Sequence, residues 1–224
     1  MKEQWCIPAV SSEFVAAMEE TLDLYATPYD SKRPKVNFDE TSKQLIKETR
    51  TPLPARPGQP ERYDYEYERN GTRNLFLVVE PQAGWRHVEV TERRTKLDFA
   101  QQMKWLVEER YPEAEFIELT LDNLNTHQPA SLYEAFAPEE ARRILRKIRF
   151  HYTPKHGSWL NMAEIELSVL QRQCLDRRLP DEATLKQEVA AWEERRNEQK
   201  ATIDWQFSLE TARTKLKRLY PSTS

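Results

Sequence analysis

The chain has 224 residues, of which 38% are hydrophobic and 32% charged, and its formal net charge is −3. This length suits one large domain or one domain with appendages, and the composition is typical of a folded globule with a well-solvated surface. Four glycines are too few for the usual glycine-rich loops that cradle dinucleotides or triphosphates, so we expect no nucleotide cofactor. The two cysteines form no C-x-x-C pair, which excludes a thiolate zinc site and a disulfide framework and suits a reducing cytosol. The longest apolar run, residues 75–79, is too short to cross a bilayer.

The first part of the chain is predicted to hold a helix, a strand and a long loop. Residues 12–25 carry apolar side chains at helical spacing, with Ser11 or Ser12 as the N-cap. Residues 35–39 alternate as a strand does, with Val36 and Phe38 on one face and Asn37 and Asp39 on the other. The stretch 50–72, rich in proline and tyrosine, has no clear period and is predicted to be an inserted loop.

The rest of the chain alternates between strands and helices. Residues 74–80 and 85–91 read as a hairpin. Helices are predicted at 95–111, 129–146 with a break at Pro138, 161–175, 181–199 and 208–219, and strands at 115–122 and 148–152. This order favours an α/β fold, a mixed sheet with helices on both faces followed by C-terminal helices.

Two acidic residues occupy similar places. Asp39 and Asp122 are each predicted to close a strand on its polar face. Acids at the carboxyl ends of neighbouring strands point into the crevice where α/β proteins bind ligands, and their repulsion is costly unless a cation lies between them. Oxygen ligands of this kind suit Mg²⁺ or Mn²⁺.

A third acid could come from the helix at 161–175, which contains Glu164 and Glu166. These two lie about 200° apart around the helix, so only one can face a given site. We expect Ile165, Val169 and Leu170 to face inward, with both glutamates flanking that stripe, so periodicity alone does not choose between them. Three carboxylates holding two ions would match the two-metal arrangement for phosphodiester displacement.

Three segments strongly resemble the catalytic domain of bacterial insertion-sequence transposases related to mariner, the insertion sequence 630 family. They are FDETSKQLIKETR (38–50), LDNLNTH (121–127) and HYTPKHGSWLNMAEIE (151–166). The resemblance implies a ribonuclease-H-like fold and a metal-binding Asp-Asp-Glu triad. Carried over by motif, the triad is Asp39, Asp122 and Glu164, with Glu166 as the alternative third acid.

The resemblance also implies a domain division. We expect a helical lead-in over 1–33, the catalytic domain over 34–180 with the inserted loop 50–72, and a helical extension over 181–224. No clear helix-turn-helix precedes Asp39, so we expect a catalytic domain alone.

The function implied is metal-dependent cleavage and strand transfer of DNA during transposition, a recombination that integrates the element at a new site. Two Mg²⁺ or Mn²⁺ ions would serve each site, the partners would be transposon ends and target DNA, and loop 50–72 would join a homodimer. The alternatives are a non-catalytic, dimerising regulatory fragment and a nuclease that cuts without joining. The expected location is the bacterial cytoplasm, on the nucleoid when bound to DNA, with no membrane contact.

Basic side chains are candidates for contacts with DNA phosphates. His127 and His151 are interpreted as structural. The candidate contacts are Lys155 and His156 just before the third acid, and Arg142, Arg143, Arg146 and Lys147 in the basic run before residue 148.

Overall fold

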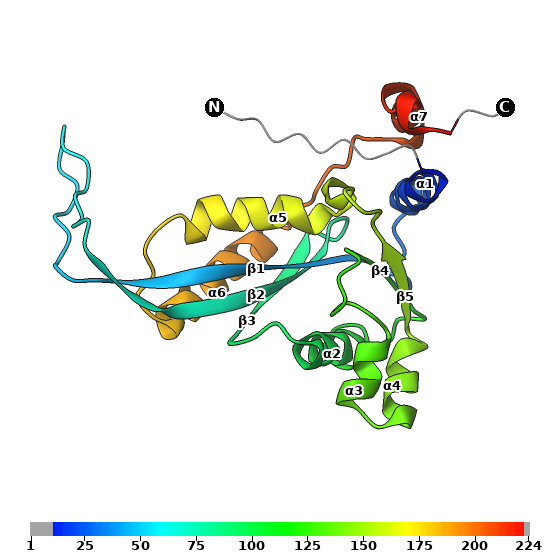
Figure 1. Cartoon of the computed structure of the whole chain (residues 1–224), viewed down its shortest axis with the longest axis horizontal. Helices are drawn as coiled ribbons and strands as arrows, with labels where there is room; N and C mark the ends of the chain where they lie inside the picture. Colours follow the sequence, from blue (N-terminus) through cyan, green and yellow to red (C-terminus); the bar gives the residue numbers. More distant parts are fainter. Residues whose placement is uncertain (1–10, 222–224) are drawn as a thin grey trace.

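The computed structural model describes residues 11–221 and is built around one five-stranded sheet (Figure 1). Its spatial order is β3-β2-β1-β4-β5. β1 pairs antiparallel with β2, and β2 with β3, whereas β1 with β4 and β4 with β5 are parallel. The strands are β1 (Lys35–Glu48), β2 (Tyr67–Glu80), β3 (Trp85–Thr91), β4 (Ile117–Leu121) and β5 (Ile148–Tyr152). The predicted mixed sheet is confirmed.

Helices cover both faces of this sheet, as predicted. The α-helices are α1 (Ser12–Ala26), α2 (Lys96–Trp105), α3 (Ala130–Ala135), α4 (Pro138–Leu145), α5 (Met162–Leu170), α6 (Glu182–Glu198) and α7 (Leu209–Lys215). The π-helical turns η1 (Leu106–Arg110) and η3 (Gln171–Leu175) prolong α2 and α5, and the 3-10 turns are η2 (Ser158–Leu160) and η4 (Lys217–Leu219). No helix within residues 11–221 is both long and apolar enough to span a bilayer.

Two hydrophobic cores lie on opposite faces of the sheet because side chains alternate along each strand. Val36 and Phe38 of β1 pack with α2, α3 and α4 in one core. Leu45 of β1, together with β2 and β3, packs with α5, η3 and α6 in the other, where Trp192 is fully buried. A smaller cluster joins α1 to α7. Figure 1 shows α5 along one side of the sheet and α2, α3 and α4 grouped on the other.

The first strand is longer than predicted. β1 does not end at Asp39 but runs on to Glu48, and β2 already begins at Tyr67, which pairs with Glu48. The connecting residues 49–66, here called the arm, carry two further isolated bridges, Leu53 with Arg62 and Arg56 with Gln59. The predicted loop is therefore largely a projecting hairpin (Figure 1). Sequence period missed it because the arm is mostly exposed and has no buried face to impose an alternation.

Candidate active site

Asp39 lies within β1, and Asp122 directly follows β4, the parallel strand next to it. In the register of β1 and β4, Asn37 stands opposite Thr120, so the same register continued by two residues brings Asp39 opposite Asp122. Phe38 belongs to the core on the α2 side, which directs Asp39 beside it to the opposite face, where Asn161 contacts it. Neighbouring strands are about 4.8 Å apart, so the two carboxyl groups lie close together.

These acids lie where the two strands separate. β4 ends at Leu121, whereas β1 continues past Asp39 and pairs only with β2 from there on. The prediction that Asp39 closes a strand is wrong, because β2 keeps β1 hydrogen-bonded well beyond it. Of the two strands, only β4 ends at its acid.

Asn161 places the start of α5 beside Asp39. As the N-cap of α5, its side chain accepts from the Ala163 N–H at 3.1 Å. Its Nδ2 donates to the Phe38 carbonyl at 2.9 Å and more weakly to Asp39 Oδ2 at 3.4 Å. Asn161 is fully buried, so this contact between α5 and β1 is shielded from water. Glu164, in the first turn of α5, is exposed next to this junction.

The two glutamates of α5 have different environments. Glu166 is buried and paired with Arg86 and Arg196, whereas Glu164 has its carboxylate in solvent. The expectation that Ile165 faces inward is wrong, since it is 39% exposed, and α5 buries Met162, Ala163, Glu166 and Leu170 instead. The two arginines make it possible for a glutamate to occupy an inward position, which periodicity cannot reveal. These contacts occupy Glu166 and favour Glu164 as the third acid.

The acids interact electrostatically. Burial, together with the nearby charges of Glu164, Asp122 and Glu40, raises the pKa of the Asp39 carboxyl group from 3.8 to about 7, against the opposing effect of the hydrogen bond from the Glu40 backbone N–H. Glu164 and Asp122 are therefore both within electrostatic range of Asp39.

The donor set suits a hard divalent cation, because clustered carboxylates without a cation repel one another. Within residues 11–221, no three side chains of metal-binding type are already gathered around a common point. Holding an ion would therefore require rotamer changes, for which the exposed side chain of Glu164 is free.

His127 contacts Asp122 and Glu40. Its Nδ1 is 2.5 Å from Asp122 Oδ1, and its Nε2 is 2.9 Å from Glu40 Oε2, close enough for an ion pair although not aligned as a hydrogen bond. Burial favours the neutral imidazole, but the hydrogen bond to Asp122 and the negative charges of Asp122 and Glu40 prevail and raise the pKa of His127 to about 9. The ring also packs on Phe38 and Phe99.

This contact joins the structural role expected for His127 to the candidate site. The only signal for it in the sequence is the five-residue spacing from Asp122, and spacing alone does not show that the two side chains meet.

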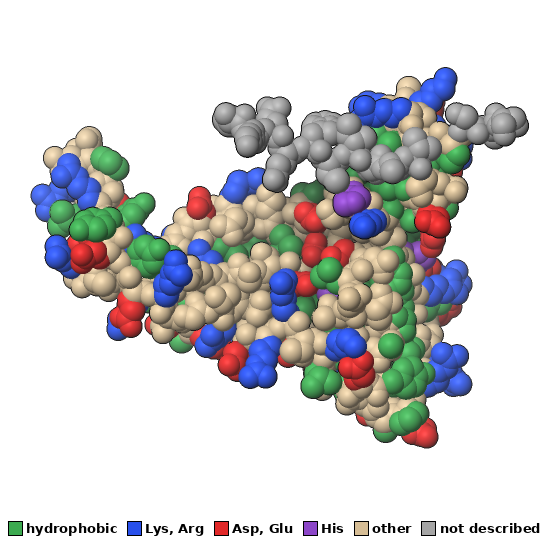
Figure 2. All heavy atoms as spheres, in the orientation of Figure 1, with side chains coloured by type: hydrophobic (Ala, Val, Ile, Leu, Met, Phe, Trp, Pro, Cys, Tyr) green, Lys and Arg blue, Asp and Glu red, His purple; other side chains and the backbone are tan. Residues whose placement is uncertain are grey.

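Lys155 and His156 are exposed at the rim of a groove of about 660 Å³. The groove runs along α1, past Phe14 and Ala17, to Asn123, the residue after Asp122. The groove thus brings this pair of predicted DNA contacts near the residue that follows Asp122. On the face shown in Figure 2, acidic and basic side chains lie close to one another beside a histidine.

The basic run of α4 is not brought to the acids. α4 packs in the core on the opposite face of the sheet. Arg143 pairs with Glu108, and Lys147 Nζ donates to the carbonyls of Pro112 at 3.0 Å and Ala114 at 2.6 Å. Arg142 and Arg146 are exposed. A role in DNA binding for this run stays a prediction.

Comparison with known proteins gives one family and one group of structures. Residues 34–186 match the family model described as a DDE superfamily endonuclease. No curated protein matches the chain. The Mos1 mariner paired-end complex with Mn has a similar structure, with a TM-score of 0.58 at 15% identity, covering 90% of this chain and 61% of that one. For the Mos1 transposase paired-end complex with the left transposon end, the TM-score is 0.55 at 14% identity, with coverage of 98% and 64%.

A third structure, the pre-cleavage Mos1 transpososome, gives a TM-score of 0.56 at 13% identity, with coverage of 90% of this chain and 65% of that one. This chain therefore spans less than two thirds of the length of each of these three proteins. At such low identity the similarity establishes the shared ribonuclease-H-like fold, which agrees with the predicted fold class.

Proposed function

This chain belongs to the DDE superfamily of endonucleases, and we propose that it is the catalytic domain of an insertion-sequence transposase, which cleaves DNA and joins it to a new site. The observation that supports the proposal is that Asp39 on β1 lies within electrostatic range of Asp122, which directly follows the neighbouring strand β4, and of Glu164 at the start of the adjoining helix. Three carboxylates from distant parts of the chain repel one another when the fold brings them together, unless a cation binds between them.

Each acid has its own role in the proposed site. Asp39 and Asp122 present oxygens from rigid strands, Glu164 closes the set from α5, and His127 orients Asp122. The donor set fits Mg²⁺ or Mn²⁺, and we propose two ions per site. When bound, such ions would polarise the phosphate and lower the pKa of the attacking water.

The reaction consists of two successive displacements at phosphorus. Water attacks a phosphodiester at the end of the element and releases a 3′-hydroxyl, which then attacks a phosphodiester of the target DNA. Lys155 and His156, at the rim of the groove beside Asn123, are proposed to bind phosphates next to the reacting one. The proposed location on bacterial nucleoid DNA follows from these partners.

The partners are proposed to be two transposon ends, target DNA and a second copy of this chain. Mos1 structures described as paired-end and strand transfer complexes support the first two. The arm is suited to dimerisation because it projects from the sheet and carries exposed apolar side chains. Leu53, Tyr63 and Tyr65 are 63%, 63% and 84% exposed.

The test uses the purified chain, DNA carrying the element's terminal repeats, and Mn²⁺. We expect nicked and then joined products, and loss of both in Asp122→Ala. Asp23→Ala, which removes an exposed carboxylate on α1, is the matched control and should leave both products unchanged. Persistent nicking by Asp122→Ala would refute the assignment of the site, and nicking without joined products would indicate a nuclease.

A further inference from the structure

We propose that Glu166, held by Arg86 and Arg196, is a positioning residue that sets the rotation of α5 about its axis and so directs Glu164 toward Asp39. The inference rests on the proposed function, because it assigns Glu164 as the third acid. It gives a role to a buried carboxylate that the proposed chemistry does not itself use.

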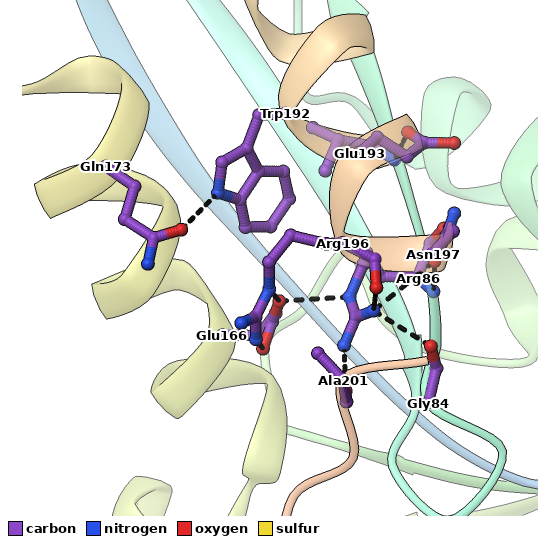
Figure 3. A network of polar contacts seen from close by, with 10 residues as sticks. Gly84, Arg86, Glu166, Gln173, Trp192, Glu193, Arg196, Asn197 and Ala201 are labelled. Atoms are coloured by element: carbon purple, nitrogen blue, oxygen red, sulfur yellow. Dashed lines mark hydrogen bonds and ion pairs between the residues drawn. The ribbon is translucent and has the colours of Figure 1, made fainter. Parts of the chain in front are cut away.

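Glu166 is clamped between two guanidinium groups (Figure 3). Arg86 Nε donates to Oε1 at 3.0 Å. Arg196 donates to both oxygens, from Nε to Oε1 at 3.1 Å and from Nη2 to Oε2 at 2.9 Å. The side chains of Arg86 and Glu166 are 0% and 1% exposed, and that of Arg196 is 17% exposed. Such a two-pronged contact fixes direction as well as distance.

Arg86 fastens this clamp to the rest of the domain. Its Nη1 donates to the carbonyls of Gly84 and Arg196, each at 2.9 Å, and its Nη2 donates to the carbonyl of Ala201. The backbone of Arg86 also exchanges two hydrogen bonds with the side chain of Asn197, at 2.9 and 2.8 Å. Glu166 is therefore tied to β3 and to the end of α6 through groups that are themselves held in place.

Two anchors hold α5 at different points along its length. Asn161, its N-cap, ties the start of the helix to β1, and Glu166 ties its second turn to β3 and α6. Glu164 lies between them and projects about 200° away from Glu166. With a side-chain radius of about 5–6 Å, a 20° rotation of the helix would move the carboxylate by about 2 Å. Metal–ligand distances tolerate about 0.2 Å, so an unanchored helix would place Glu164 poorly.

Stability alone does not account for this cluster. Replacing a buried ion pair by apolar side chains of similar volume is often neutral or stabilising, so Ala163 and Leu170 could anchor α5 with an apolar neighbour at position 166. Apolar packing is not directional, whereas a carboxylate between two guanidinium groups has one orientation. Position 166 therefore carries an oriented ionic contact in place of apolar packing. This position lies two residues from Glu164, whose direction matters for the proposed site.

The test separates the positioning of Glu164 from the stability of the fold. Electron paramagnetic resonance measures Mn²⁺ binding to the full chain without DNA, and thermal unfolding gives the melting temperature. Arg196→Gln removes the less buried of the two guanidinium groups that hold Glu166. We expect it to fold with a lowered melting temperature and to bind Mn²⁺ about 10-fold more weakly, with partial recovery in Arg196→Lys. Arg195→Gln, the same change at an exposed position of the same helix, should match the wild type in both measurements.

A second variant covers the case in which the loss of one charge prevents folding. Replacing Arg86, Glu166 and Arg196 together by methionine removes all three charges, so the protein should fold and yet still bind Mn²⁺ more weakly than the wild type. Wild-type affinity in this variant or in Arg196→Gln would overturn the positioning role and leave the proposed function standing. A wild-type chain that binds no Mn²⁺ would contradict the proposed function and this role together.

Discussion

Replacing Asp39 by Asn should stabilise the metal-free protein while abolishing DNA cleavage. The pKa of Asp39 is raised from 3.8 to about 7, first by burial and then by the charges of Glu164, Asp122 and Glu40. Between about pH 4 and pH 7, the unfolded chain has released this proton while the folded chain keeps it. The free energy of unfolding therefore falls as pH rises through that window, and above pH 7 the whole cost is present.

The pKa shift of Asp39 determines how much Asp39→Asn should stabilise the protein. About three pKa units at 1.36 kcal/mol each give about 4 kcal/mol as an upper bound. Asp39 is only partly buried, so solvent and side-chain relaxation reduce this to about 2 kcal/mol. Asn keeps an oxygen for the Glu40 N–H, which donates at 2.8 Å, and loses only the 3.4 Å contact with Asn161. In a chain of this size, about 2 kcal/mol corresponds to a rise of about 4–8 °C in melting temperature.

The assay is thermal unfolding with a chelator at pH 5 and pH 8, then with Mn²⁺ at pH 8. We expect Asp39→Asn to melt above the wild type at pH 8, with a smaller difference at pH 5. Mn²⁺ should stabilise the wild type and have little effect on Asp39→Asn, because a ligand stabilises only the form that binds it. Asp23→Asn, an exposed control, should melt as the wild type does. The reasoning is refuted if Asp39→Asn melts below the wild type at pH 8 in chelator.

Two further substitutions test the supports of the site. His127→Ala should destabilise the protein by about 3 kcal/mol at pH 6, because it leaves the buried Glu40 and the partly exposed Asp122 without their cation. The loss should be smaller at pH 10, because the imidazolium's contribution is lost as pH rises through its pKa of about 9. Urea unfolding at both pH values measures this, and an equal loss at both would contradict a charged His127. Gly84→Ala should lower the free energy of unfolding by about 2 kcal/mol, since Gly84 has φ +66° and an added Cβ would collide with the backbone of Lys200. The control is Gly58→Ala, where φ is +76° and an added Cβ would have no atom within 4 Å, and thermal unfolding should show a smaller loss.

Local pattern predicted most of the elements correctly. The strand at 148–152 and the hairpin turn before Trp85 agree with the structure, and the helix predicted at 12–25 ends one residue later. Alternation around Val36 and Phe38 placed Asp39 on the face opposite these two side chains, as observed. These features depend on neighbours within a few residues, and a period of 2 or 3.6 records them directly in the sequence.

Features that depend on residues far away in the chain could not be predicted from local sequence period. The length of β1 depends on β2, which returns to pair with it, so the predicted strand was too short. The orientation of α5 depends on Arg86 and Arg196, which allow Glu166 inside and leave Ile165 exposed.

The sequence by itself determined that Asp39 lies on the face of its strand opposite Val36 and Phe38, because the period of a strand is a local property of the backbone. Only the tertiary structure decided that Asp39 and Asp122 stand at the same level, that His127 supports Asp122, and that Glu164 rather than Glu166 has its carboxylate free. Each of these depends on the register and burial of segments far apart in the chain, and the energy of a buried charge is set by the partner it meets there.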